Sequence, residues 1–220
     1  MKPLGIILII LVLVAVVGVG YLYFNAITRL SGANAAATSL QVAKKLTSTA
    51  KTAIVATDIS YHDALAASPY SYAQHAPIFL TEDNGSRLPA EAVDTIAKGG
   101  YNVVIAGGSA SVSDDVFNQL KKAGVDVSRI SGNNAYETAD LFATWSVKHG
   151  MSWSNLGIAT VGSHYDALTG GALCGKLGGV LLLGDDYNNT ACVRIAGENK
   201  FTIGSAYVFG GSASVGDKTY

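Results

Sequence analysis

Charged residues are scarce in this chain of 220 residues: only 14% of its positions are Asp, Glu, Lys or Arg, against about 25% in typical soluble domains. Neither sign is in excess, because 15 Lys and Arg stand against 16 Asp and Glu, a net charge of −1. A protein that binds nucleic acid usually presents a basic face, so this balance argues against one. Two Cys and four His are too few for a disulfide scaffold or a set of zinc modules.

Apolar residues are abundant instead, at 49% of the chain, and there are 25 Gly. This apolar content is too high for a disordered chain and leaves room for one or two globular domains. The four His residues lack the spacing of metal ligands. The sequence therefore predicts a folded chain that holds no metal or other cofactor.

The longest apolar run lies near the N-terminus, where Leu4 to Phe24 include no charged side chain. As a helix rising about 1.5 Å per residue, this run would span roughly 30 Å, the thickness of a bilayer core. Tyr21 and Tyr23 stand where an interfacial aromatic belt would lie. We expect residues 1–25 to be a retained membrane anchor; the alternative is a cleaved signal peptide, whose apolar region is usually shorter. Both alternatives place the remaining residues outside the cytoplasm.

Three sequence blocks occur twice, in the same order and about 100 residues apart. The pairs are RLSGANAAAT at 29–38 and RISGNNAYET at 129–138, Asp-Ala-Leu at 63–65 and 166–168, and GGSASV at 107–112 and 210–215. Their order and spacing indicate an internal duplication. We expect a first unit over 26–128 and a second over 129–220.

Within each unit, stretches of helical spacing alternate with short apolar runs. Helices are expected at 38–46, 63–74, 89–98, 113–122, 134–149, 166–177 and 188–197. Strands are expected at 52–57, 77–81, 102–106, 125–130, 156–161, 180–183 and 206–209. Strands that are apolar on both faces and alternate with helices are typical of a parallel sheet with helices on both sides, so the fold class is α/β. The second unit stops soon after its GGSASV block, without a last helix and strand, which suggests either a fragment or a chain completed by association.

The repeated blocks resemble the bacterial cell-wall-binding type 2 repeat of surface proteins from clostridia and related Gram-positive bacteria. The similarity covers about residues 27–220 and rests on R-[IL]-S-G-x-N, on Asp-Ala-Leu after a strand, and on a strand followed by Gly-Gly-x-x-x-Val. It implies flavodoxin-like α/β units, usually three in tandem in a three-fold assembly. It also implies non-covalent attachment to anionic wall polymers.

The first repeated block supplies the candidate contacts with such a polymer. In open α/β sheets, ligands bind beyond the carboxyl ends of the strands, beside helix N-termini that favour anions. The candidate polymer-binding residues are Arg29, Asn34, Thr38, Arg129, Asn134, Tyr136 and Thr138. The alternative is structural: the Asn residues cap helices and the Thr residues complete local hydrogen bonds, while the Arg residues pair with carboxylates between the repeats.

Two further patterns invite chemical interpretations. Ser, His and Asp lie together before Asp63 and again before Asp166, but catalytic triads meet through the fold rather than along one loop, and the His changes position between the repeats. We therefore interpret both Asp residues as first-turn residues of helices, favoured by the helix dipole. GGSASV lacks the spacing of a nucleotide loop. Cys174 and Cys192 lie on consecutive predicted helices and would form either a disulfide or two free buried thiols.

These observations favour a non-catalytic surface module that binds anionic wall polymers and is tethered to a membrane. One alternative is a structural subunit that self-associates into a surface layer or filament. A hydrolase or nucleotide-binding enzyme is the other, and it is disfavoured because the two repeats do not preserve an acid, a base and a nucleophile at matching positions.

Overall fold

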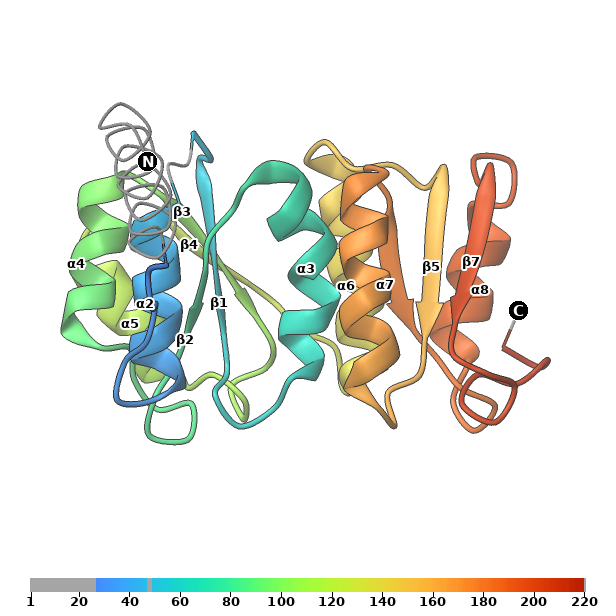
Figure 1. The fold of residues 1–220 in the computed structure, drawn as a ribbon, viewed down its shortest axis with the longest axis horizontal. Helices are drawn as coiled ribbons and strands as arrows, with labels where there is room; N and C mark the ends of the chain where they lie inside the picture. The colour runs from blue at the N-terminus through green and yellow to red at the C-terminus, as the bar shows by residue number, and fades with distance from the viewer. Residues whose placement is uncertain (1–26, 47–48, 220) are drawn as a thin grey trace, which may run out of the picture. The chain divides into compact units, whose positions relative to one another are not determined.

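The computed structural model describes residues 27–46 and 49–219 (Figure 1). Gly32–Tyr220 is grouped as one compact unit, apart from the residues before it, and contains almost all of both repeats. The predicted anchor, Leu4 to Phe24, lies outside the described residues. Among the residues that are described, no helix combines the length and the hydropathy that a membrane span requires.

Helices and strands alternate through both repeats, as predicted. The first repeat contains α2 (Ala35–Lys45), β1 (Thr52–Ala56), α3 (His62–Gln74), β2 (Ile78–Leu80), α4 (Ala90–Gly99), β3 (Asn102–Ala106), α5 (Asp114–Lys122) and β4 (Val127–Ile130). The second contains α6 (Ala135–Lys148), β5 (Asn155–Ala159), α7 (His164–Lys176), β6 (Val180–Leu183), α8 (Thr190–Glu198) and β7 (Ser205–Phe209). The helix expected at 38–46 starts earlier, at Ala35, because Asn34 caps it.

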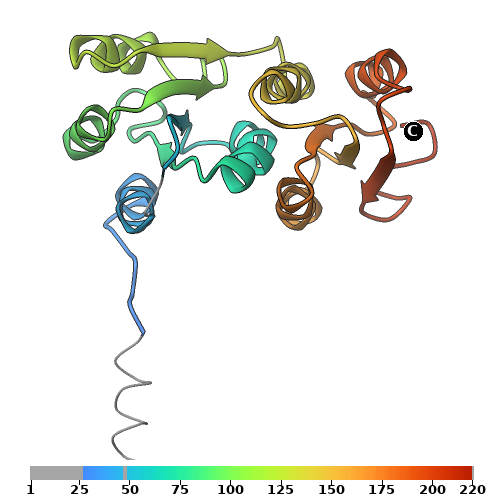
Figure 2. The same cartoon turned by 90° about the horizontal axis from the view of Figure 1, so that it is seen from above.

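The strands form two parallel sheets, in the orders β2-β1-β3-β4 and β6-β5-β7. Alternate residues of the central strands enter different cores, since successive side chains of a strand point to opposite faces. Val55 and Ile105 pack with residues of α2, α4 and α5. Ile54 and Val104 pack with residues of α3 and α6 on the other face. Figure 2 shows that helices cover both faces of the first sheet. The α/β prediction is confirmed.

The two repeats share one core. Tyr70 of α3 and Phe142 of α6 belong to the same buried cluster, which also includes strand residues from both sheets. Helix α3 packs closely against α6 and α7. Glycines of α7 permit this approach, because a Cβ atom at Gly175 would lie 2.7 Å from Tyr72 Cβ and 2.8 Å from the Pro69 carbonyl oxygen. The repeats are therefore not independent modules on a flexible linker.

Equivalent strands of the two repeats differ in burial. β3 pairs with β1 on one side and β4 on the other, and four of its five residues are buried. β7 pairs with β5, and no residue of β7 is fully buried. In the described part of the chain, the second sheet thus ends at β7, where the first sheet continues to β4.

Candidate functional site

The Ser-Gly-x-Asn block of the first repeat forms a closed loop before α2. The Asn34 side chain accepts a hydrogen bond from the Ala37 backbone N–H (2.8 Å), and Thr38 Oγ1 accepts one from the Gly32 N–H (3.0 Å). The amide nitrogen of Asn34 donates to Glu82 (3.3 Å). The bond to Ala37 satisfies a backbone donor that a helix N-terminus otherwise leaves unpaired, and the other two bonds hold the loop against the helix and Glu82.

The second repeat reproduces this loop before α6. Asn134 accepts a hydrogen bond from the Glu137 N–H (2.9 Å), and Thr138 Oγ1 accepts one from the Gly132 N–H (3.0 Å). All four predicted Asn and Thr residues are therefore engaged in shaping the loops, as the structural alternative described. Their contact with a polymer stays a prediction.

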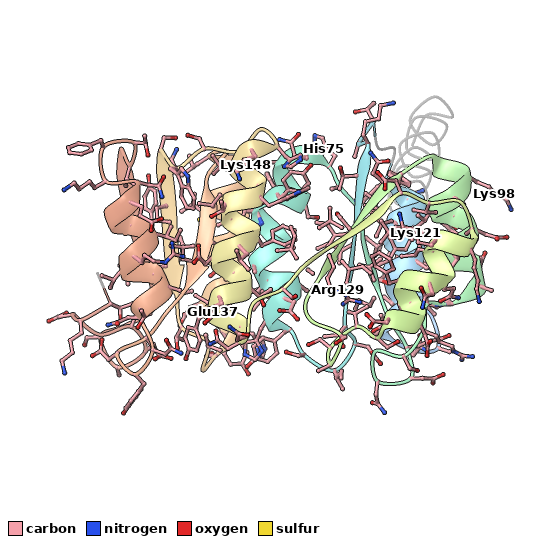
Figure 3. The ribbon with its side chains drawn as sticks, turned by 180° about the vertical axis from the view of Figure 1, so that it is seen from behind. His75, Lys98, Lys121, Arg129, Glu137 and Lys148 are labelled. Atoms are coloured by element: carbon pink, nitrogen blue, oxygen red, sulfur yellow. The ribbon has the colours of Figure 1, made fainter. Side chains whose placement is uncertain are left out.

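The two predicted arginines have different surroundings. Arg129 lies on β4 (Figure 3), and its guanidinium donates to the carbonyl oxygens of Gly107 (2.9 Å) and Val112 (2.8 Å) and pairs with Asp114 (3.1 Å). Its side chain is mostly buried, so it fixes the loop after β3. Arg29 is exposed.

Tyr136, the remaining predicted residue, lies at the start of α6. Its hydroxyl donates to Asp185 (2.8 Å), in the loop between β6 and α8. Burial, followed by the Asp185 carboxylate, raises the pKa of Tyr136 to about 12. The other Asp185 oxygen accepts from the backbone N–H groups of Tyr187 and Asn188. Tyr136 is thus a neutral donor at physiological pH, and it ties α6 to this loop.

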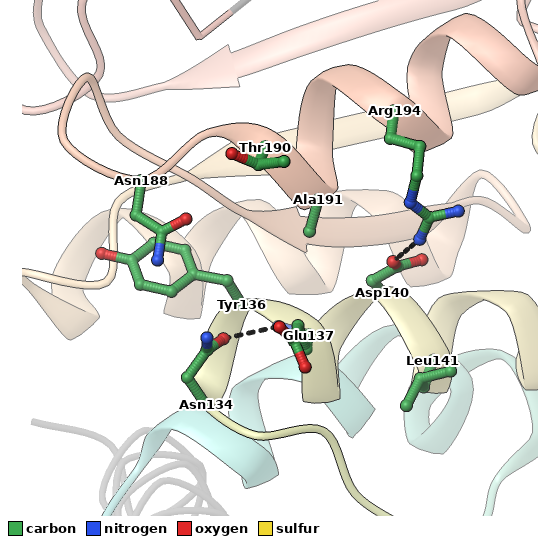
Figure 4. A pocket seen from close by; sticks show the side chains of 9 residues that line it. All are labelled: Asn134, Tyr136, Glu137, Asp140, Leu141, Asn188, Thr190, Ala191 and Arg194. Carbon is green, nitrogen blue, oxygen red and sulfur yellow. Dashed lines mark hydrogen bonds and ion pairs between the residues drawn. The ribbon is translucent and has the colours of Figure 1, made fainter.

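A cavity of about 250 Å³ opens between α6 and α8 (Figure 4). Its lining residues come from the two helices, the N-cap of α6 and the loop before α8. They are Asn134, Tyr136, Glu137, Asp140, Leu141, Asn188, Thr190, Ala191 and Arg194. Two of the predicted site residues, Asn134 and Tyr136, line it. Thr138 and Arg129 do not, and the cavity was not predicted from the sequence.

Asp140 is the buried acid of this cavity, with 4% of its surface exposed. One of its carboxylate oxygens pairs with Arg194 of α8, whose guanidinium also bonds both oxygens of Glu198 (2.9 and 3.0 Å). The other oxygen, Oδ1, has no hydrogen-bond partner among the residues that the structure describes. Burial raises the pKa of Asp140 against the opposing effect of Arg194. A signal was present in the sequence, because the duplication aligns Asp140 with apolar Leu40.

Asp63 and Asp166 have a structural role that links two of the repeated blocks. Both lie in the first turn of a helix, α3 or α7. A Cβ atom at Gly107 would collide with the Asp63 carboxylate, and one at Gly210 would lie 2.9 Å from Asp166 Oδ2. These glycines have φ of +112° and +119°, which other residues rarely adopt. The Asp-Ala-Leu and Gly-Gly blocks therefore recur together because they touch.

The Ser and His residues near Asp63 do not form a triad with it. Ser60 Oγ lies 2.7 Å from His62 Nδ1, and His62 Nε2 is 3.1 Å from the Val161 carbonyl oxygen. Both ring nitrogens of His62 are thus engaged by groups other than a carboxylate, so no acid orients the base as in a triad. The Asp63 carboxylate instead faces Gly107 and Ser111.

Replacing Asp63 with Asn is expected to flatten the dependence of stability on pH. Burial raises the pKa of Asp63, although His62 and Ser111 oppose the shift. The native state then binds a proton more tightly than the unfolded state, so the free energy of unfolding falls as the pH rises from about 3.8 through the native pKa. The variant lacks this fall in the free energy of unfolding, which urea unfolding between pH 3.5 and 7.5 measures. Asp166→Asn, at the less buried equivalent position, is the control; equal pH profiles for Asp63→Asn and the parent would contradict the prediction.

Cys174 and Cys192 are free, buried thiols. The disulfide alternative is thus corrected: Cys174 lies in the cluster between α7 and the second sheet, and Cys192 lies in the cluster on the opposite face of that sheet. Burial raises their pKa values to about 11 and about 12.

Both thiols are expected to resist alkylation in the native protein. At pH 8, a pKa of about 11 leaves about one thiol in a thousand ionised, and the thiolate is the reactive form. Iodoacetamide followed by mass spectrometry should find almost no label on the native chain and two labels after denaturation without a reductant. One or no label on the denatured, unreduced chain would mean that the thiols are oxidised.

Comparisons with known proteins agree with this architecture. The family model described as cell wall binding domain 2 (CWB2) matches residues 29–117 and 129–220. The chain is 35% identical over 193 residues to the amidase enhancer of Bacillus subtilis (strain 168), covering 87% of this chain and 25% of that protein. It is 37% identical over 116 residues to N-acetylmuramoyl-L-alanine amidase LytC of the same strain, covering 52% of this chain and 23% of the amidase. The chain thus spans about a quarter of either relative.

Two solved structures share the fold. Cwp6 from Clostridium difficile superposes with a TM-score of 0.75 and covers 86% of this chain and 30% of its own. Cwp8 from the same species has a TM-score of 0.76 and covers 88% of this chain and 32% of its own. Both are 24% identical to this chain. The predicted resemblance to cell-wall-binding repeats is confirmed.

Proposed function

This chain belongs to the cell wall binding domain 2 family, and we propose that its two repeats attach it non-covalently to anionic polymers of a Gram-positive-type wall. The observation that carries the proposal is the match of the family model to both repeats. The shared core of the repeats supports it, because a rigid pair of repeats loses little conformational freedom when it binds an extended polymer. We further propose that the chain acts outside the cytoplasm and catalyses no reaction on the polymer.

The predicted contacts divide by their availability to a polymer. Arg29 has an exposed side chain that can approach a phosphate or carboxylate. Arg129 already donates to backbone carbonyls, and its substitution would disturb the loop after β3. We therefore assign the direct anion contact to Arg29 and a positioning role to Arg129.

Pull-down on purified walls tests this function. The full chain should sediment with intact walls and be lost from walls stripped of anionic polymers, and binding should weaken as salt rises. Arg29→Gln should reduce binding, whereas Lys98→Gln, at a position with a side chain 80% exposed on α4, should not. Equal binding to stripped and intact walls would overturn the anionic polymer as the ligand.

Self-association is the second candidate function, and the edge strand β7 favours it. Equivalent β3 residues are buried by β4 and α5, while β7 leaves its outer edge and part of its apolar surface open in the described chain. Open strand edges template pairing with another chain. Sedimentation in detergent over a wide concentration range should then show species larger than the monomer; a monomer throughout would exclude this function.

The membrane anchor and a third repeat stay predictions.

A further inference from the structure

We propose that the cavity between α6 and α8 binds a sugar residue that carries a protonated amine. This inference rests on the proposed function only for the source of the sugar, a wall polymer. The second repeat would thus bind a positively charged group of the polymer, whereas the other groups expected on such a polymer are anionic.

The charges around the cavity favour a cation. Two carboxylates, Glu137 and Asp140, line it, against the single guanidinium of Arg194. That guanidinium is already shared between Asp140 and Glu198, so it has little capacity left for an anion. A phosphate entering the cavity would meet an excess of negative charge, whereas an ammonium group would be attracted.

Hydrogen-bonding capacity points in the same direction. Asp140 Oδ1 is buried without a partner in the described chain, and a buried acceptor in that state calls for a donor. An ammonium group supplies three donors. Two other polar side chains of the lining, those of Asn188 and Thr190, offer both donors and acceptors to the hydroxyl groups of a sugar ring.

A metal ion fits the cavity less well than an organic cation. The described residues contain no group of three or more His, Cys, Asp or Glu side chains arranged to hold a metal. The volume of about 250 Å³ is below the range of roughly 300–1,000 Å³ typical of sites for drug-sized ligands. It therefore suits one monosaccharide unit rather than a longer segment.

The first repeat shows that the fold does not need these polar groups. The duplication aligns Tyr136, Glu137 and Asp140 with Ala36, Ala37 and Leu40. Leu40 is 3% exposed and packs in the apolar core of its repeat. The same position thus folds well with an apolar side chain. In the second repeat, the ion pair with Arg194 accounts for one oxygen of Asp140, and the unpartnered Oδ1 is left for ligand binding to explain.

Calorimetric titration of the full chain in detergent, with four related sugars as probes, tests the inference. D-Glucosamine should bind more tightly than D-glucose or N-acetyl-D-glucosamine, and D-glucose 6-phosphate should bind most weakly. Asp140→Leu, which copies the first repeat, should keep the fold and weaken glucosamine binding at least about tenfold, as expected for a lost hydrogen bond to a charged group. Glu137→Gln should weaken it as well, and it guards against an Asp140→Leu chain that fails to fold.

Asp94→Asn, which removes an exposed acid of α4 outside the cavity, is the matched control and should bind glucosamine as the parent does. Equal affinity for glucosamine and glucose, or unchanged binding by both cavity variants, would overturn the inference. Wall pull-down separates this result from the proposed function. If the chain binds walls but not glucosamine, the cavity ligand alone is refuted. If it binds glucosamine but not walls, the wall attachment alone is refuted.

Discussion

Replacing Phe142 with alanine is expected to destabilise both repeats together, by about 3–5 kcal/mol. Phe142 is fully buried on α6, and its cluster includes residues of β1, α3 and β3 from the first repeat as well as β5 and β6 from the second. Its ring also lies 5.5 Å from that of Trp145. Removal of the ring leaves a cavity in the core that the repeats share, so the loss cannot be confined to one of them.

Urea unfolding followed by circular dichroism and by Trp fluorescence measures this effect, with one coincident transition expected for the parent. The duplication provides the matched control, because Val42 of α2 aligns with Phe142 and is 44% exposed. Val42→Ala should change the unfolding free energy by less than about 1 kcal/mol. Two separate transitions in the parent, or a Phe142→Ala loss as small as that of Val42→Ala, would contradict a shared core.

The contrast between Phe142 and Val42 shows why the fold was predictable and the interface between repeats was not. Strands such as 102–106 and 180–183 coincide with β3 and β6, because short apolar runs bounded by Gly and polar residues specify their own burial. The caps at Asn34 and Asn134 are equally local. Which face of α6 meets the first repeat depends on residues far away in the sequence.

The cavity escaped prediction for a similar reason. Asp140 of α6 pairs with Arg194 of α8. In the sequence, β5, α7 and β6 lie between these two helices. Local patterns describe the neighbours of a residue along one helix, whereas this pair depends on how α6 and α8 cover the same sheet face. The signal that sequence reasoning could have used is the acid at Asp140, which the duplication aligns with apolar Leu40.

The cores of the two repeats fill equivalent space with side chains of different size. Phe209 of β7 aligns with Ala106 of β3, and its ring lies over two glycines, Gly157 and Gly170. The first repeat has Ile54 and Ala67 at the positions of these glycines. One large aromatic side chain therefore occupies the space that three smaller side chains fill in the first repeat.

Gly170→Ala is accordingly expected to destabilise the protein even though it lies within a helix. Alanine is favoured over glycine in helices by about 1 kcal/mol. The added Cβ atom would collide with the ring of Phe209, including its Cγ atom. Because Cγ is where the ring is attached, turning the ring about its own axis does not move this atom out of the way. Overpacking costs about 1–3 kcal/mol, which outweighs the helical gain.

The effect of Gly170→Ala on stability should change sign when Phe209 is first replaced by alanine. With the ring gone, Gly170→Ala keeps its helical advantage and refills part of the space, so it should stabilise the Phe209→Ala chain by up to about 1 kcal/mol. A double-mutant cycle of urea unfolding energies then gives a coupling of about 1–3 kcal/mol between the two positions. Additive effects of the two substitutions would show that the glycine is not there to accommodate the ring.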